Sequence, residues 1–269
     1  MTIAGSDSGG GAGVQADLKT FAAHGVFGTS VITAVTAQNT AEVRGVHVLD
    51  PAFVELQMDA VLSDLPVAAV KTGMLASSAT VAAVARWAAA GRLPNLVVDP
   101  VLVASTGRSL LDEDGVESYL RLLVPHASVL TPNIREAALL TGSTVQDVDD
   151  MVRAAHVLAD AGADVVVVKG GHLAGEQAPD VVLFGGAVRI LDTPRVSSHN
   201  DHGTGCTLSA ATAALLARGV EITEAVTRAK AFVTAALQGS AAWHLGAGHG
   251  PLDHFGWGSS PGPDPRARS

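Results

Sequence analysis

Hydrophobic positions along the chain follow two alternating patterns. Short runs rich in Val, Ile and Leu, typical of buried strands, alternate with longer Ala- and Leu-rich stretches whose apolar residues recur at helical spacing. The predicted strands cover residues 31–35, 68–71, 96–99, 128–131 and 165–169. The predicted helices cover residues 13–23, 51–62, 77–90, 112–123, 135–140, 148–161, 206–217 and 222–243. This alternation predicts right-handed βαβ crossovers and an α/β fold with a mostly parallel central sheet and helices on both faces.

Two segments depart from the alternation. Residues 180–191 carry Gly185-Gly186 between two Val-rich halves, which predicts a small antiparallel hairpin. Residues 256–269 are rich in Gly, Ser, Pro and Arg without periodicity, which predicts a disordered tail. We therefore expect a single domain over residues 1–255.

Composition narrows the class of protein. Hydrophobic residues make up 48% of the 269 residues and aromatic ones only 4%, so the core must consist of Ala, Val and Leu, as in parallel sheets covered by helices. The net charge of −9 and the absence of a basic run argue against nucleic-acid binding. With one cysteine, no signal-peptide pattern and no long apolar window, we expect a cytoplasmic protein that does not enter a membrane.

Polar residues gather where the predicted strands end. Ligands of open parallel sheets bind beyond the carboxyl ends of the strands. The residues at these positions are Thr36, Gln38, Asn39, Lys71, Thr72, Asp99, Thr131, Asn133, Glu136, Lys169 and Gly170. Carboxylates and a lysine beside glycine-rich helix starts are what phosphoryl transfer from a magnesium nucleotide requires.

Two glycine-rich loops precede predicted helices. The first, residues 5–13, holds five glycines but fits neither a Walker A nor a dinucleotide fingerprint, so a plain strand-to-helix turn and a ligand loop remain equally open. The second, residues 203–207, reads Gly-Thr-Gly-Cys-Thr. A helix N-terminus directs free backbone N–H groups at one point, which favours an anion such as a transferring phosphate.

Seven motifs in the same order resemble one enzyme family. They are Gly-Ser-Asp-x-x-Gly-Gly-Ala-Gly at the start of residues 5–21, Thr-Ala-Gln-Asn-Thr (36–40), Lys-Thr-Gly-Met-Leu (71–75), Val-Asp-Pro-Val (98–101), Thr-Pro-Asn-x-x-Glu-Ala (131–137), Lys-Gly-Gly-His (169–172) and His-Gly-Thr-Gly-Cys-Thr (within 202–211). Over residues 2–255 the chain resembles the hydroxymethylpyrimidine and phosphomethylpyrimidine kinases of thiamine biosynthesis, which are ribokinase-like. The resemblance implies phosphorylation of 4-amino-5-hydroxymethyl-2-methylpyrimidine by ATP to the monophosphate and then the diphosphate. It also implies a homodimer.

The resemblance assigns the aminopyrimidine to the first half of the chain. Gly5, Asp17, Gln38 and Met74 would hold the ring, and the Gln38 amide can donate to a ring nitrogen and accept from the exocyclic amine. Without the resemblance, Gln38 could cap its own turn and Met74 could belong to the core.

The nucleotide and its metal would lie at the later strand ends. Asp99 and Glu136 would hold Mg²⁺ through its waters, although Asn133-x-x-Glu136 is also a capping-box spacing. The residues that would face the nucleotide are Thr131, Asn133, Lys169 and Gly170. Lys169 could instead be a solvated charge at a strand end.

The second loop would form the catalytic anion site. Gly203, Thr204 and Gly205, with Lys169, would bind the γ-phosphate, while Cys206 stands where sugar kinases of the superfamily carry a catalytic aspartate. We expect the helix N-terminus to lower the pKa of Cys206, so that its thiolate serves as base for the hydroxyl in the first step. The second acceptor is an ionised phosphate and needs no base. The alternative for Cys206 is a small buried residue without a chemical role.

Two other functions stay open at this point. A pyridoxal kinase would use the same scaffold for another hydroxymethyl heteroaromatic ring, and substrate competition separates the two. A non-catalytic pyrimidine or nucleotide sensor would bind without transfer, and the absence of ATP turnover would favour it.

Overall fold

A single mixed sheet forms the centre of the protein. The computed structural model describes residues 1–102 and 114–259, whose strands form one nine-stranded sheet in the order β3-β2-β1-β4-β5-β6-β7-β8-β9. The strands are β1 (Thr2–Asp7), β2 (Ser30–Gln38), β3 (Val43–Val48), β4 (Val70–Thr72), β5 (Leu96–Val98), β6 (Val129–Leu130), β7 (Val165–Lys169), β8 (Asp180–Phe184) and β9 (Ala187–Leu191). Neighbours from β2 to β7 are parallel, and β3, β8 and β9 pair antiparallel at the two edges. The predicted fold class is confirmed.

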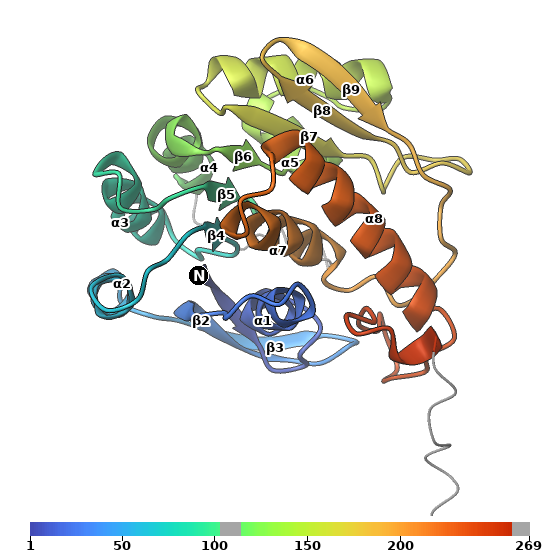
Figure 1. Cartoon of the computed structure of the whole chain (residues 1–269), viewed down its shortest axis with the longest axis horizontal. Helices are drawn as coiled ribbons and strands as arrows, with labels where there is room; N and C mark the ends of the chain where they lie inside the picture. The colour runs from blue at the N-terminus through green and yellow to red at the C-terminus, as the bar shows by residue number, and fades with distance from the viewer. Residues whose placement is uncertain (103–113, 260–269) are drawn as a thin grey trace, which may run out of the picture.

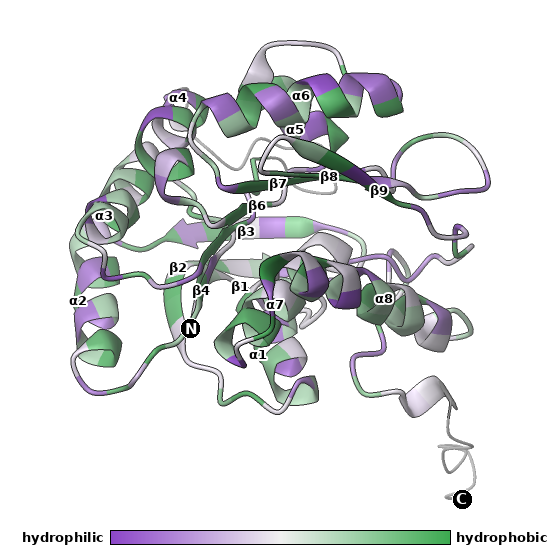
Figure 2. Ribbon diagram, turned by 45° about the horizontal axis from the view of Figure 1, so that its top comes forward, coloured by the Kyte–Doolittle hydropathy of each residue, from purple (hydrophilic) through white to green (hydrophobic). Residues whose placement is uncertain are grey.

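Helices cover both faces of the sheet (Figures 1 and 2). One face carries α1 (Gly13–Ala23), α7 (Thr204–Ala217) and α8 (Ile222–Ser240), packed on a core of mostly Ala, Val and Leu. The other carries α2 (Pro51–Leu62), α3 (Ser78–Ala89), α4 (Gly115–Ser118), α5 (Ile134–Thr141) and α6 (Val148–Asp160). In α7 every residue from Thr207 to Leu216 is buried, because this helix lies between α1, α8 and the sheet.

Most helices begin at the side-chain caps that their sequences provide. Ser77 accepts a hydrogen bond from the Thr80 amide, and Asp147 accepts one from the Asp150 amide. At α7 the N-cap is Gly203, with a left-handed φ of 87° and no side-chain cap. Helices α1 and α4 also begin without a side-chain cap, and an uncapped helix start leaves backbone donors available to a ligand.

The structure departs from the predicted elements in several places. Strands β1 and β3 were not among the predicted strands. The helix expected over residues 112–123 begins at Gly115 and continues as a π-helix over Tyr119–Leu123, while residues 112 and 113 lie outside the described chain. Helix α8 ends at Ser240 rather than residue 243.

A further correction concerns the predicted tail. It begins too early, because Trp257–Ser259 forms a 3-10 turn whose Trp257 and Gly258 amides donate to Asp253. Residues 260–269 lie outside the described chain, so their predicted disorder is not tested. No helix in the described residues is long and apolar enough to span a membrane.

Candidate active site

The carboxyl ends of three parallel strands meet the start of α7. Asp99 follows β5, Asn133 follows β6, and Lys169 ends β7. Lys169 Nζ lies 2.8 Å from Asp99 Oδ1 and 4.0 Å from Glu136 Oε2. A Cβ atom on Gly205, near the start of α7, would lie 3.1 Å from Lys169 Nζ. The structure therefore brings together the predicted metal, nucleotide and anion residues. We call this place, formed by Asp99, Asn133, Glu136, Lys169 and Gly205, the carboxyl edge.

Lys169 is a paired ammonium group rather than a solvated charge. Burial alone would lower the pKa of Lys169, but Asp99 and Glu136 raise it above its usual value. Asp99 is 1% exposed, and Thr131 Oγ1 and Ser209 Oγ also lie 3.4 Å and 3.2 Å from its oxygens. The alternative of a free surface lysine is thereby excluded. Thr131 is buried behind Asp99, so its hydroxyl supports that carboxylate.

Glu136 forms the capping box that its spacing predicted. Its Oε2 accepts from the Asn133 amide at 2.7 Å, and its own amide donates to Asn133 Oδ1 at 3.0 Å. Burial raises the pKa of Glu136 above its usual value, since the side chain is almost wholly removed from water. The cap fixes the carboxylate beside Lys169 at the carboxyl edge.

The donor set of the carboxyl edge suits a magnesium ion held mostly by water. Asp99 and Glu136 supply hard oxygen ligands, which Mg²⁺ prefers, and each carboxylate has about four lone-pair sites, more than the protein partners named above occupy. Within the described residues no three His, Cys, Asp or Glu side chains cluster as metal ligands. Two protein carboxylates with waters and a nucleotide therefore fit the group better than an all-protein cage does.

The first turn of α7 carries open backbone donors. The amides of Gly205 and Cys206 have no hydrogen-bond partner within residues 1–102 and 114–259. Thr204 is different, because its amide and hydroxyl both donate to the Asp201 carbonyl, at 3.2 Å and 2.6 Å. An anion could bind the two free amides while Lys169 stands beside them.

The expected lowering of the Cys206 pKa is wrong for this structure. Burial raises the pKa of the thiol to about 11, and it outweighs the opposing effect of the Lys71 ammonium. The thiol is thus protonated at neutral pH in this state. The helix N-terminus does not overcome the loss of water around the sulfur.

The first glycine loop is closed on itself. Asp7, at the end of β1, accepts hydrogen bonds from the Gly9, Gly11 and Ala12 amides at 2.8–3.1 Å. Burial alone would raise the pKa of Asp7, but the hydrogen bonds from His202, Ala12 and Gly9 lower it below its usual value. Asp7 is the anion of this loop, so these amides are not available to a phosphate.

The two glycine loops pack directly against each other. A Cβ on Gly203 would lie 1.9 Å from the Gly11 carbonyl oxygen, and one on Gly11 would lie 2.5 Å from His202 Cδ2. His202 Nε2 lies 3.0 Å from Asp7 Oδ2. Gly203 therefore serves the close approach of the loops, in addition to starting α7.

Three of the four residues predicted for the pyrimidine lie near these loops. A Cβ on Gly5 would touch the end of the Met74 side chain, and the Gln38 amide lies 3.2 Å from His202 Nε2. Asp17 differs because it is fully buried, 2.9 Å from Lys71 Nζ, with Thr2 Oγ1 donating to the same carboxylate at 2.6 Å. Its oxygens face protein partners, and its predicted contact with substrate gains no support from this arrangement.

A pocket of about 160 Å³ opens from the carboxyl edge between β7 and α8. Apolar side chains such as Val196 and Leu237 line it, together with Asn133, Lys169 and Gly205. Gly170 is not part of the lining. Its amide donates to Asp180, and a Cβ there would strike the Pro179 carbonyl at 1.9 Å.

Several residues that support the site were missed from the sequence. Arg195 donates to four carbonyls of the loop after β7, those of Gly171, Leu173, Gly175 and Gln177. Nothing in the pattern around Arg195 marks this role. The role of Asp7 could have been predicted from the sequence, because an acidic residue before consecutive glycines commonly binds their backbone amides.

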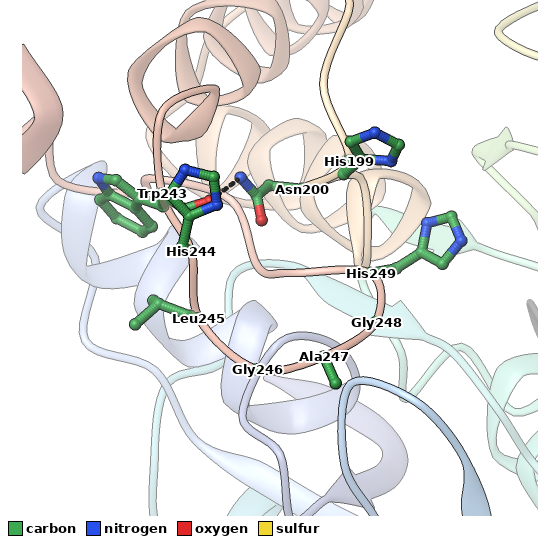
Figure 3. A pocket seen from close by; sticks show the side chains of 9 residues that line it. All are labelled: His199, Asn200, Trp243, His244, Leu245, Gly246, Ala247, Gly248 and His249. Carbon is green, nitrogen blue, oxygen red and sulfur yellow. Dashed lines mark hydrogen bonds between the residues drawn. The ribbon is translucent and has the colours of Figure 1, made fainter.

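A second hollow lies elsewhere and holds none of the predicted site residues. It measures about 420 Å³, and Figure 3 shows its walls, formed by His199, Asn200 and the loop from Trp243 to His249. Asn200 Nδ2 donates to the Ser240 and Trp243 carbonyls, which fixes this loop. The hollow shares no lining residue with the pocket at the carboxyl edge.

Comparisons with known proteins identify the family of this chain. A family model described as phosphomethylpyrimidine kinase matches residues 7–253. The hydroxymethylpyrimidine/phosphomethylpyrimidine kinase of Rhizobium meliloti (strain 1021) is 51% identical over 257 residues, which cover 95% of this chain and 96% of that protein.

Solved structures of related kinases share the fold of this chain. The phosphomethylpyrimidine kinase of Clostridium difficile 630 is 42% identical with a TM-score of 0.77, covering 87% of this chain and 96% of that one. The pyridoxal kinase of Staphylococcus aureus, in complex with AMP-PCP and pyridoxal, is 36% identical with a TM-score of 0.86, covering 95% and 93%. Because the family model matches residues 7–253, which is nearly the whole chain, this chain belongs to the phosphomethylpyrimidine kinase family.

Proposed function

We propose that this chain transfers the γ-phosphate of ATP to 4-amino-5-hydroxymethyl-2-methylpyrimidine, and then a second phosphate to the monophosphate, in thiamine biosynthesis. The observation that carries the proposal is the open start of α7, whose Gly205 and Cys206 amides lie beside the Lys169–Asp99 pair. Free amides and a fixed ammonium group stabilise the charge of a transferring phosphoryl group.

The nucleotide would occupy the pocket between β7 and α8. Its apolar lining suits the face of an adenine base, while Asn133, Lys169 and Thr204 stand at the phosphate end. The Staphylococcus aureus relative binds AMP-PCP on a similar fold, which supports ATP as the donor. Mg²⁺ would be held by Asp99 and Glu136 through water, and it would neutralise charge on the phosphates.

The acceptor would lie between the two glycine loops and Met74. In the first step, the hydroxymethyl oxygen bonds to the γ-phosphorus as the bond from that phosphorus to the β,γ-bridging oxygen breaks, and ADP leaves. The hydroxyl proton passes to Cys206 in its thiolate form, which a pKa of about 11 makes a minor species at neutral pH. In the second step, a phosphate oxygen is the nucleophile, and no proton has to be removed. With a thiol pKa of about 11, the first step is the one that becomes faster as pH rises.

Pyridoxal is the second candidate acceptor, because the Staphylococcus aureus pyridoxal kinase shares this fold at 36% identity. Phosphorus NMR with Mg-ATP and each compound in parallel tests both. Sequential monophosphate and diphosphate from the pyrimidine alone supports the proposal. Product from pyridoxal alone moves the function to pyridoxal phosphorylation, and no product from either supports a sensor.

We further propose a homodimer in the cytoplasm. Val35 and Val48 at one end of the sheet are 46% and 42% exposed, and Phe53 on the neighbouring α2 is 51% exposed, which would suit a subunit contact. Light scattering during size-exclusion chromatography measures the oligomeric state. A mass of 27.2 kDa throughout the concentration range would contradict the dimer.

A further inference from the structure

One imidazole nitrogen faces two side chains from distant parts of the chain. His202 Nε2 lies 3.0 Å from Asp7 Oδ2 and 3.2 Å from the side-chain amide nitrogen of Gln38. The three residues come from the segment before α7, the end of β1 and the end of β2. The side chains of His202 and Asp7 are only 15% and 5% exposed, so water does not replace these contacts freely.

The hydrogen bonds of His202 Nε2 depend on whether this nitrogen carries a proton. Asp7 accepts three backbone N–H groups, and its pKa lies below the usual value because hydrogen bonds from His202 and these amides outweigh burial. An ionised carboxylate only accepts hydrogen bonds, so Nε2 of His202 must carry the proton that points to Asp7. A protonated Nε2 cannot also accept a hydrogen bond from the Gln38 amide nitrogen.

The Gln38 amide must therefore turn its oxygen toward His202. Rotation of the terminal amide exchanges oxygen and nitrogen at almost no cost in shape, and the partners in the network determine which orientation is stable. With the oxygen facing the imidazole, the NH₂ group faces away from it. The backbone of Gln38 is fixed independently, because its amide and carbonyl both bond to Ser8 Oγ at 2.8 Å and 2.7 Å.

We propose that His202, anchored by Asp7, fixes the Gln38 amide with its NH₂ group toward the substrate and so makes the site selective for rings with a hydrogen-bond acceptor at that edge. This inference rests on the proposed function, because it concerns the same pyrimidine site. His202 is a positioning residue that acts through Gln38. A 4-aminopyrimidine offers an unprotonated ring nitrogen, whereas the 4-oxo analogue carries a hydrogen there and would set two donors against each other.

The test compares the two pyrimidines with wild type and two His202 variants. His202→Phe keeps a ring against Gly11 but removes the donor, and His202→Gln returns an N–H near the position of Nε2. We expect His202→Phe to reduce the preference for the amino over the oxo compound about 10- to 100-fold, through the KM of the pyrimidine and not that of ATP. His202→Gln should restore most of the preference. His199→Phe, an exposed histidine three residues away, is the matched control and should change nothing.

A double-variant comparison keeps the test decisive if His202→Phe also disturbs the loops. In a Gln38→Met background, His202→Phe should have no further effect on the preference, because the amide that it orients is gone. An unchanged preference in His202→Phe, or an equal loss in both backgrounds, would overturn the inference. Binding of each pyrimidine is also measured by calorimetry. If wild type binds the amino compound selectively but transfers no phosphate, the proposed function fails while the inference about His202 stands.

Discussion

The two glycine-rich loops have similar composition and opposite uses. In the first loop the Gly9, Gly11 and Ala12 amides all bind Asp7, which belongs to the same loop. In the second, the Gly205 and Cys206 amides have no partner within the described chain, and Lys169 stands beside them. The comparison teaches that glycine content does not identify an anion site. The partners of the backbone N–H groups do, because a donor already bound to a carboxylate cannot stabilise a phosphate.

The largest effect on activity should come from replacing Lys169 beside the second loop, and Lys19 beside the first loop provides the comparison. Lys169→Met removes the ammonium group between Asp99 and Glu136, and we expect kcat/KM to fall about 1000-fold, the size seen when one charged or hydrogen-bonding group is removed from a transition-state site. Lys19→Met is the matched control, since Lys19 Nζ donates to the Gly10 carbonyl of the first loop at 2.7 Å. Its activity should stay within about twofold of wild type. Steady-state kinetics for both phosphorylations, with circular dichroism for folding, measure the two variants.

An equal loss in the two lysine variants would contradict the division of roles between the loops. A loss below tenfold in Lys169→Met would show that the amides of α7 stabilise the transferring group without the ammonium.

The next largest effect tests the anion inside the first loop. Asp7→Asn replaces two acceptor oxygens by one, so at least one of the amides or His202 loses its partner, and we expect the free energy of unfolding to fall by about 2–3 kcal/mol. The pKa of Asp7 is lower in the folded state, because hydrogen bonds outweigh burial. Its contribution is therefore complete above the unfolded pKa, near 4, and disappears as pH falls below that value.

Urea unfolding of wild type and Asp7→Asn at several pH values measures both effects. The difference in stability between the two proteins should be constant from pH 5 to 8 and shrink below pH 4. A difference that shrinks as pH rises instead would mean that Asp7 is not the ionised acceptor.

Sequence alone was sufficient for the fold and for the family. Regular alternation of Val-rich and Ala-rich runs predicted the parallel sheet, since both faces of such strands are buried and their periodicity is plain. Strand β3 was missed because its sequence, Val-Arg-Gly-Val-His-Val, is half-exposed at an edge and looks like a loop. The tail was placed too early because the Asp253 side chain, rather than any apolar pattern, orders residues 257–259.

Only part of the site could be predicted from the sequence, because the type of a residue does not show which partners the fold brings to it. Asp99, Glu136, Asn133 and Lys169 were named correctly as neighbours, because the ends of parallel strands meet at one edge. The burial of Asp17 against Lys71 could not be read from the sequence, since an acidic residue on a helix gives no sign of a buried cation from another strand. Burial also reversed the expected pKa of Cys206, which depends on how much water the fold removes.

Replacing Cys206 in the second loop should have a smaller effect on activity, and this effect should differ between the two phosphorylation steps. Cys206→Ala removes the proposed base, and we expect the first transfer to slow about tenfold to a hundredfold, while the second slows less than about threefold. The rate of the first transfer in wild type should rise with pH toward the thiol pKa of about 11, which burial raises, and Cys206→Ala should lose this rise. Single-turnover measurements with each acceptor from pH 6 to 9 give both rates. Equal slowing of the two steps would exclude the base role.

The smallest effects come from adding one methyl group to each loop. Gly10 has a φ of 76°, and a Cβ there would meet only Lys19 Nζ, at 3.6 Å, so Gly10→Ala should cost about 1 kcal/mol of stability through backbone strain and leave activity unchanged. Gly205 lies inside the first turn of α7 with an ordinary helical backbone, where Ala is favoured over Gly. Its Cβ would lie 3.1 Å from Lys169 Nζ and 3.9 Å from Asp99 Oδ2, so Gly205→Ala should keep or raise stability and lower activity about fivefold to tenfold by displacing the ammonium group. Thermal unfolding and kcat/KM, measured on both variants, should therefore move in opposite directions between the loops. If Gly10→Ala lowered activity as much as Gly205→Ala, the first loop would also contact the reacting groups, and the contrast between a closed and an open glycine loop would no longer hold.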